Sequence, residues 1–206
     1  MNDYTATRHS LHAVAERLLA GPQYREADTI RLTTVSGGFA TTVAPAVTVD
    51  GNRLRVGDGT SHRLHDRTIV ELATLTGIVA GAPQGVYRDT ADWDDETPLI
   101  VDSVAAQMIS EAFGHGDAAL RTLPGAPEPV LWPEHFDLAI SLEEANYGVS
   151  PGDSTIPEPY AYVGPWVRPT GEFWNQPFGA ARPLSELDGA KAIATFFAEG
   201  RRRAAL

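Results

Sequence analysis

The amino-acid sequence predicts an α+β protein with a mainly antiparallel sheet of about five to seven strands and with helices packed on one face or end. Short alternating segments separated by Gly-containing turns are typical of antiparallel hairpins. Helical patterns occur near the two ends and in the middle of the chain, so they are too few to connect successive strands in parallel. A chain of 206 residues has the usual size of one well-cored domain, and we expect a single domain over residues 1–206.

The composition excludes several classes of function. The chain has 27 acidic and 16 basic side chains, and its formal net charge of -11 disfavours nucleic acid and anionic membrane surfaces as partners. It contains no cysteine, which excludes disulfides, thiolate catalysis and cysteine-ligated metals. No segment approaches the roughly 20 apolar residues of a membrane span, and the first residues lack the pattern of a secretory signal. We therefore expect a cytoplasmic protein with neither a nucleic-acid nor a membrane partner.

The N-terminal third predicts one helix followed by an antiparallel meander. Leu11, Val14 and Leu18 recur at helical spacing, and Gly21-Pro22 should end the helix. Turn signals at Gly37-Gly38 and at Asp50-Gly51 then separate alternating segments. These predicted strands cover residues 29–35, 43–49 and 53–56.

Two further helices are predicted in the middle of the chain. Thr68 and Glu71 have the spacing of a capping box, which should open a helix that runs to about Val79. Asp102 can cap the next helix, which Gly114 and Gly116 should interrupt. The acidic segment 89–96 between these helices is predicted to be a solvated loop.

The sequence is organised around residues 134–142, which alternate strictly and predict a strand with one apolar and one polar face. The polar face would carry His135, Asp137 and Ser141. Residues 143–159 are rich in Pro, Gly and Asp and predict a long irregular loop, the kind of loop that often carries function.

The last third predicts aromatic strands and a closing helix. Residues 160–166 alternate again, and Pro165 indicates that this strand lies at a sheet edge or ends there. Residues 173–178 form another short aromatic segment. Ser185 should open the final helix, whose last turn carries three arginines that complement the helix dipole.

His135 and Asp137 are the candidate catalytic residues. On one strand face, Asp137 or Glu134 could orient His135 as a general base. The H-x-D spacing also occurs in non-haem iron sites, but no histidine follows His135 in the chain, and we predict no metal. Alternatively, both side chains hydrogen-bond to backbone at the entry of the strand.

The candidate ligand-binding residues surround this predicted strand. Aromatic side chains can line a small-molecule pocket, although ordinary core or edge packing is the favoured explanation of the same residues. The candidates are Glu143, Tyr160, Tyr162, Trp166 and Trp174.

Other motifs do not point to a chemistry. Residues 148–152 match the G-x-S-x-G pattern of a hydrolase elbow, but Pro151 has no N–H to serve as the oxyanion donor. The H-x-x-H pairs that begin at His9 and His62 lack a second pair of zinc ligands nearby. Nucleotide-binding signatures are missing, so we predict no cofactor.

Residues 130–139 contain the sequence F-D-L-A, and the aromatic segments 160–166 and 173–184 follow. In this order they resemble an uncharacterised, largely actinobacterial family of domains of unknown function. Its pattern joins a hairpin and two helices to a strand with F-D-L-A, an aromatic segment and a closing helix. The resemblance implies no activity and no catalytic residues. Serine occupies the position of His135 in the family pattern, which implies that a catalytic His–Asp couple is not a family-wide device. The position of Asp137 matches the pattern, which leaves Asp137 as either a structural anchor or a ligand-binding carboxylate.

The leading hypothesis is a small-molecule-binding protein or a cofactor-free acid/base enzyme. Its site would lie between the polar face of residues 134–142 and the loop 143–159. The alternative is a non-catalytic interaction module that uses an aromatic edge strand, for example to form a homodimer.

Overall fold

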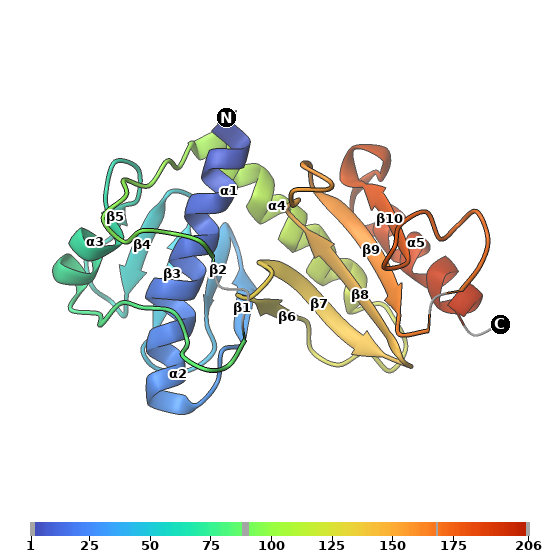
Figure 1. Cartoon of the computed structure of the whole chain (residues 1–206), viewed down its shortest axis with the longest axis horizontal. Coiled ribbons are helices and arrows are strands. Elements are labelled where there is room, and N and C mark those ends of the chain that lie inside the picture. Colours follow the sequence, from blue (N-terminus) through green and yellow to red (C-terminus); the bar gives the residue numbers. More distant parts are fainter. Residues whose placement is uncertain (1–2, 88–90, 168, 205–206) are drawn as a thin grey trace. The chain divides into compact units, whose positions relative to one another are not determined.

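The computed structural model describes residues 3–87, 91–167 and 169–204, and these residues confirm the α+β class (Figure 1). They form ten strands, more than the sequence predicted, and every strand pairing described is antiparallel. The chain divides into two compact units. Unit 1 comprises Met1–Glu111 and Leu131–Phe136, and unit 2 comprises Ala112–Val130 and Asp137–Leu206. The single domain expected from the sequence stays a prediction, and each unit is described by itself.

Unit 1 begins with a continuous helix formed by α1 (Asp3–Val14), the π-helical turn η1 (Ala15–Ala20) and α2 (Gly21–Ala27). The predicted end at Gly21-Pro22 was therefore wrong. In the π-helical turn the Gly21 N–H bonds to the carbonyl of Glu16, and Pro22 leaves the next carbonyl, that of Arg17, without a helical donor. The Gly81 N–H donates to that carbonyl at 2.9 Å. A Cβ on Gly21 would lie 1.7 Å from the Gly81 oxygen, so only glycine permits this close approach.

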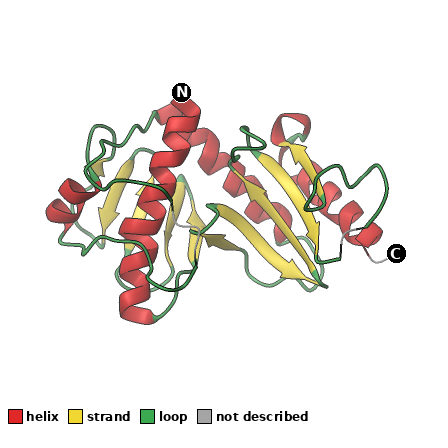
Figure 2. Ribbon diagram, viewed as in Figure 1, coloured by secondary structure: helices red, strands yellow, loops and turns green. Residues whose placement is uncertain are grey.

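The sheet of unit 1 is the predicted meander. Strands β1 (Leu32–Val35), β2 (Gly38–Thr41), β3 (Val47–Asp50), β4 (Arg53–Val56) and β5 (His62–Arg63) pair in sequence order. Strand β6 (Val130–Trp132) joins the other side of β1 through Leu131. The α1–α2 helix crosses this sheet (Figure 2). The core beneath it includes side chains that are at most 2% exposed, namely Leu11, Leu18, Leu32, Phe39 and Leu54.

Two predicted helix starts are confirmed. The Thr68 hydroxyl accepts the Glu71 N–H at 3.1 Å, and the Glu71 carboxylate accepts the Thr68 N–H at 3.3 Å, which opens α3 (Ile69–Thr76). The Asp102 carboxylate accepts the Ala105 N–H at 2.9 Å at the start of α4 (Ser103–Leu120). The predicted interruption of α4 was wrong, because Gly116 packs closely against Val149, where a Cβ would come within 2.8 Å.

Unit 2 is a second antiparallel meander with helices on one face. Its strands β7 (Asp137–Leu142), β8 (Ala145–Ser150), β9 (Tyr160–Pro165) and β10 (Ala180–Pro183) also pair in sequence order. After the short 3₁₀ helix η2 (Leu184–Glu186), α5 (Gly189–Ala204) packs behind β8 and β9 in the view of Figure 1. Gly200 contacts Val163, and the Phe197 ring meets the Tyr147 ring edge-on with centroids 6.1 Å apart. The final helix thus begins at Gly189 rather than at Ser185.

The predicted loop 143–159 was partly wrong, since its first half contains strand β8. Glu143 and Glu144 both adopt left-handed backbone conformations, with φ of 51° and 59°, and form the tight turn between β7 and β8. Two-residue hairpin turns usually contain Asn-Gly or Asp-Gly, so the pair Glu-Glu does not signal a hairpin.

The predicted edge position of residues 160–166 was also wrong. Strand β9 pairs with β8 on one side and with β10 on the other. Pro165 does end the strand, as predicted. Among the described residues, β9 is therefore an internal strand, and the interaction module stays a prediction.

Across the described parts of the chain, no helix combines the length and the apolar character that a membrane crossing requires.

Candidate functional site

The candidate site lies on the face of the unit 2 sheet that is turned away from α5. Side chains alternate between the two faces, and Tyr147 and Val163 point toward α5. The opposite face therefore carries the residues in register with Tyr162. These are Asp137, Ala139 and Ser141 of β7, Asn146, Gly148 and Ser150 of β8, Tyr160, Tyr162 and Gly164 of β9, and Ala181 and Pro183 of β10.

Tyr162 lies across the middle of this face. Its hydroxyl donates a hydrogen bond to Oδ2 of Asp137, two strands away. Gly148 of the intervening strand makes room for the ring, since a Cβ there would lie 2.6 Å from both Cζ and the hydroxyl oxygen of Tyr162. Burial, followed by the charge of Asp137, raises the pKa of Tyr162 well above its usual value. The hydroxyl therefore stays protonated at neutral pH and acts as a donor.

Tyr160 extends the aromatic row and is held in the same way. Its hydroxyl donates to Oδ2 of Asp153 at 2.6 Å, and its ring centroid lies 6.2 Å from that of Tyr162. Burial raises the pKa of Tyr160 as well. Oδ1 of Asp153 accepts the backbone N–H groups of Thr155 and Ile156, at 2.6 and 2.8 Å. Asp153 thus orders the loop after β8 and orients Tyr160.

The other end of the face is accessible. The Phe178 ring meets Tyr162 edge-on, with centroids 6.2 Å apart, and this side chain is 41% exposed. On the same sheet face as Tyr162, Ser141 and Asn146 are exposed, and the Ser141 hydroxyl donates to Oδ1 of Asn146 at 2.8 Å. This face therefore carries both aromatic rings and an exposed polar pair.

The predicted strand 134–142 begins only at Asp137, so the predicted placement of His135 and Asp137 on one strand face was wrong. Residues 133–136 form a turn, in which Phe136 has a left-handed φ of 51°. Phe136 is buried in unit 1 and stacks on the His12 ring at 5.5 Å. The His135 side chain is 64% exposed, with Nε2 3.7 Å from a carboxylate oxygen of Glu134. A buried phenylalanine in the alternating pattern is equally compatible with a turn, which explains the error.

Three other candidate residues lie outside this group, and two of them have contacts that explain them without a ligand. Glu143 is exposed and accepts two hydrogen bonds from Arg201 of α5, at 2.5 and 2.8 Å, which lower the pKa of this carboxyl. Trp174 is buried and meets Phe173 edge-on at 4.9 Å. Trp166 is 66% exposed at the end of β9. Of the predicted site residues, the structure brings Asp137, Tyr160 and Tyr162 together.

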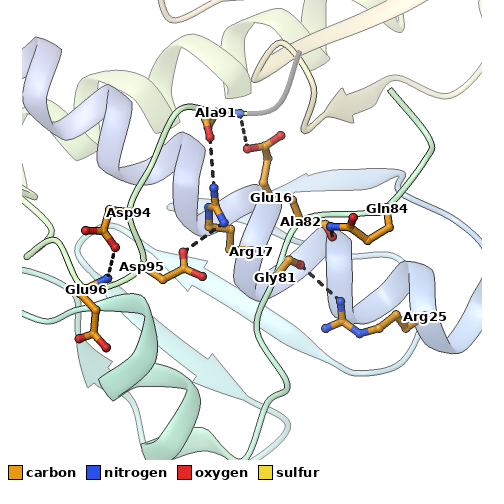
Figure 3. Close-up of polar contacts among 10 residues, drawn as sticks. All are labelled: Glu16, Arg17, Arg25, Gly81, Ala82, Gln84, Ala91, Asp94, Asp95 and Glu96. Atoms are coloured by element: carbon orange, nitrogen blue, oxygen red, sulfur yellow. Dashed lines mark hydrogen bonds and ion pairs between the residues drawn. The ribbon is translucent and has the colours of Figure 1, made fainter. Parts of the chain in front are cut away.

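A second buried polar centre lies in unit 1 and was not predicted (Figure 3). Glu16 of the π-helical turn is fully buried and accepts the Tyr87 hydroxyl at 3.0 Å and the Ala91 N–H at 2.7 Å. Arg17 donates to the Ala91 carbonyl at 3.2 Å and pairs with Asp95 at 3.2 Å. Burial raises the pKa of Glu16. In the sequence, the only indication of this buried centre is the charged Glu16 between the apolar helix positions Val14 and Leu18.

His12 lies one helical turn before Glu16. Its Nε2 is 2.7 Å from the carbonyl of Pro133, and burial lowers its pKa to about 4. The ring is therefore neutral at pH 7 and donates Nε2–H to that carbonyl. Within the described ranges, no three His, Asp or Glu side chains come together in a way that could hold a metal ion.

The fold and this face define an α+β protein with an aromatic and polar sheet surface. Comparisons with protein-family models, with curated proteins and with solved structures each found no match to this chain. The resemblance to a domain family of unknown function therefore stays a prediction.

Proposed function

We propose that the protein binds a small organic molecule on the face of the unit 2 sheet opposite α5, with Tyr162 at the centre of the site. The position of the Tyr162 ring carries this proposal. Asp137 and Gly148 hold the ring across the sheet, in a residue that is only partly buried. An aromatic ring that is already oriented offers a flat apolar contact and loses little side-chain entropy on binding.

The residues around Tyr162 suit a small molecule. Small-molecule sites are mostly apolar, with a few polar groups that fix the orientation of the ligand. The exposed part of the Phe178 ring supplies an apolar wall perpendicular to Tyr162. Asn146 and Ser141 supply an exposed amide and hydroxyl on the same face of the sheet.

The proposal is for binding rather than for acid/base catalysis. The predicted mechanism had Asp137 or Glu134 orient His135 as a general base at the polar face of the strand. The turn before β7 removes His135 from the strand of Asp137, and the exposed His135 ring lies 3.7 Å from Glu134 and not on this face. Tyr162 has a raised pKa and its proton is directed to Asp137. Asp137 therefore positions the ring of Tyr162 and is not proposed as a base.

A thermal-shift screen against a broad metabolite panel tests the proposal. A ligand at 100 times its dissociation constant adds about 2.7 kcal/mol, which raises the Tm of a chain of this size by roughly 5–10 °C. For each compound that shifts the wild type, Asn146→Ala should at least halve the shift and leave the Tm of the free protein unchanged. Gln107→Ala, which removes an exposed amide on α4, should retain the full shift.

Two results would contradict the proposal. In the first, no compound of the panel shifts the Tm of the wild type. In the second, a compound shifts wild type and Asn146→Ala equally and leaves the NMR signals of Asn146 and Tyr162 unmoved, which would place its site elsewhere.

A further inference from the structure

We propose that the ligand of the unit 2 site is an organic cation, whose substituted ammonium group lies above Gly164 and against the rings of Tyr162 and Phe178. This inference rests on the proposed function and names the class of ligand. It is carried by an unfilled position on the sheet face, by the aromatic residues next to that position, and by the distribution of charge over the strands.

Gly164 leaves an unfilled position on this face. It follows Tyr162 by two residues on β9, so both belong to the same side of the sheet, and it pairs with Asn146 of β8. Apart from chain neighbours, a Cβ added at Gly164 would meet only two described atoms within 4 Å, the backbone oxygens of Phe178 at 3.4 Å and of Asn146 at 4.0 Å. At Gly148, by contrast, the Tyr162 ring already fills the space. The surface above Gly164 therefore has room for a ligand group.

The two aromatic residues next to this position suit a cation. The planes of the Tyr162 and Phe178 rings meet at 83°, so the flat faces of one ring are not covered by the other, and Phe178 is 41% exposed. The face of an aromatic ring is electronegative and attracts a cation within about 6 Å of the ring centroid. Donation of the Tyr162 hydroxyl to the Asp137 carboxylate adds electron density to the ring, because hydrogen-bonded groups polarise one another.

The distribution of charge over strands β7 to β10 favours a positive ligand. Arg182 is the single cationic side chain of these four strands, and it lies on the opposite face, over the Phe196 ring of α5. The face of the proposed site carries Asp137 instead, and the Asp153 carboxylate accepts the hydroxyl of Tyr160. The formal net charge of -11 attracts cations and repels anions over a longer range. A neutral ligand would gain nothing from these charges.

The test compares choline with its uncharged isostere, in which a tert-butyl group replaces the trimethylammonium group. NMR titration follows the ring signals of Tyr162 and Phe178. We expect choline to move both signals saturably and the isostere to bind at least about tenfold more weakly, because the two differ in charge and not in shape. Phe178→Leu, which keeps an apolar side chain without a ring, should weaken choline binding to a similar extent. Tyr24→Leu, which removes a half-buried ring of α2 in unit 1, should leave choline binding unchanged.

Equal affinity of the wild type for choline and the isostere would overturn the proposal, and so would choline that leaves both ring signals unmoved. This comparison needs no variant, so it decides the question even if Phe178→Leu fails to fold. The ligand class and the site can fail separately. If a compound of the metabolite panel moves the signals of Asn146 and Tyr162 while choline does not, the site stands and the cationic class is wrong. If no compound moves them, the proposed site itself is wrong.

Discussion

The Tyr162 hydroxyl donates a hydrogen bond to the Asp137 carboxylate across strand β8, and this bond joins the first and third strands of unit 2. The variant Tyr162→Phe keeps the ring but removes the donor. Because Asp137 is only 7% exposed, water replaces the lost bond poorly, and we expect a loss of about 1–3 kcal/mol in the free energy of unfolding.

Urea denaturation measures this loss as a lower midpoint at unchanged m-value. Thr195→Val, which deletes an exposed hydroxyl bonded within its own helix, should change stability by less than about 0.5 kcal/mol. Equal stability of Tyr162→Phe and wild type would mean that the hydroxyl does not support the carboxylate.

Gly148 makes the Tyr162–Asp137 bond possible, so Gly148→Ala should disrupt it. The added methyl group would collide with the Tyr162 ring and with the Leu138 carbonyl, at 2.6 and 2.7 Å. We expect a cost of about 1–3 kcal/mol and non-additivity with Tyr162→Phe in a double-mutant cycle. Gly114→Ala, in a helix position with no neighbour within 4 Å of the new Cβ, should instead stabilise the protein by roughly 0.5–1 kcal/mol. Additive effects of Gly148→Ala and Tyr162→Phe would contradict the shared bond.

Glu16 is predicted to be the main stabilising contact of the segment around Ala91. In Glu16→Gln the side-chain NH₂ group replaces one of the two carboxylate oxygens, so the Tyr87 hydroxyl must turn from donor to acceptor and the Ala91 N–H bonds to an amide oxygen in place of a carboxylate. We expect a loss of about 1–3 kcal/mol in urea denaturation and faster amide exchange at Ala91. Glu96→Gln, an exposed neutralisation in the same segment, should have little effect. A fully stable Glu16→Gln protein with unchanged exchange would refute this role.

His12 should make the stability of the protein depend on pH. Its pKa is depressed from 6.5 to about 4 in the folded state, so between these values the unfolded chain binds more protons than the folded chain. Stability due to the neutral ring is therefore complete above pH 6.5 and is lost as the pH falls toward 4. At about 1.4 kcal/mol per pKa unit, the loss amounts to roughly 3 kcal/mol.

The variant His12→Gln keeps an N–H donor for the Pro133 carbonyl but does not titrate. The stability difference between wild type and His12→Gln, measured in urea at several pH values, should therefore shrink from pH 7 to pH 4. A difference that is constant over this range would show that His12 does not titrate with a depressed pKa.

Local signals predicted much of the fold. The capping residues Thr68 and Asp102 and the turn glycines of the unit 1 meander act within a few residues, so their spacing alone indicates where elements begin. The errors arose where distant contacts decide the local structure. The helix continues through Gly21-Pro22 because Gly81, far along the chain, donates to the Arg17 carbonyl and because Gly21, without a Cβ, leaves room for the Gly81 backbone. The turn of the β7–β8 hairpin consists of Glu143 and Glu144, and the distant Arg201 of α5 donates a hydrogen bond to the Glu143 carboxylate.

In the candidate site, too, local signals predicted some features, and contacts with other parts of the chain decided the rest. Alternation correctly placed Tyr160 and Tyr162 on one face, because a period of two is a property of the strand itself. It could not place His135, because a turn residue such as Phe136 can be buried as completely as a strand residue. The role of Gly148 depends on a side chain from the neighbouring strand and has no signal in its own sequence.

The short segment Leu131–Phe136 belongs to unit 1, although the residues before and after it belong to unit 2. The polypeptide therefore enters unit 1 a second time, where Leu131 pairs with Leu32 of β1. As a consequence, no single cut separates the two units into contiguous fragments. In a fragment truncated after residue 111, one edge of β1 would lack its partner strand β6. A fragment that starts at residue 112 would contain β6 without β1.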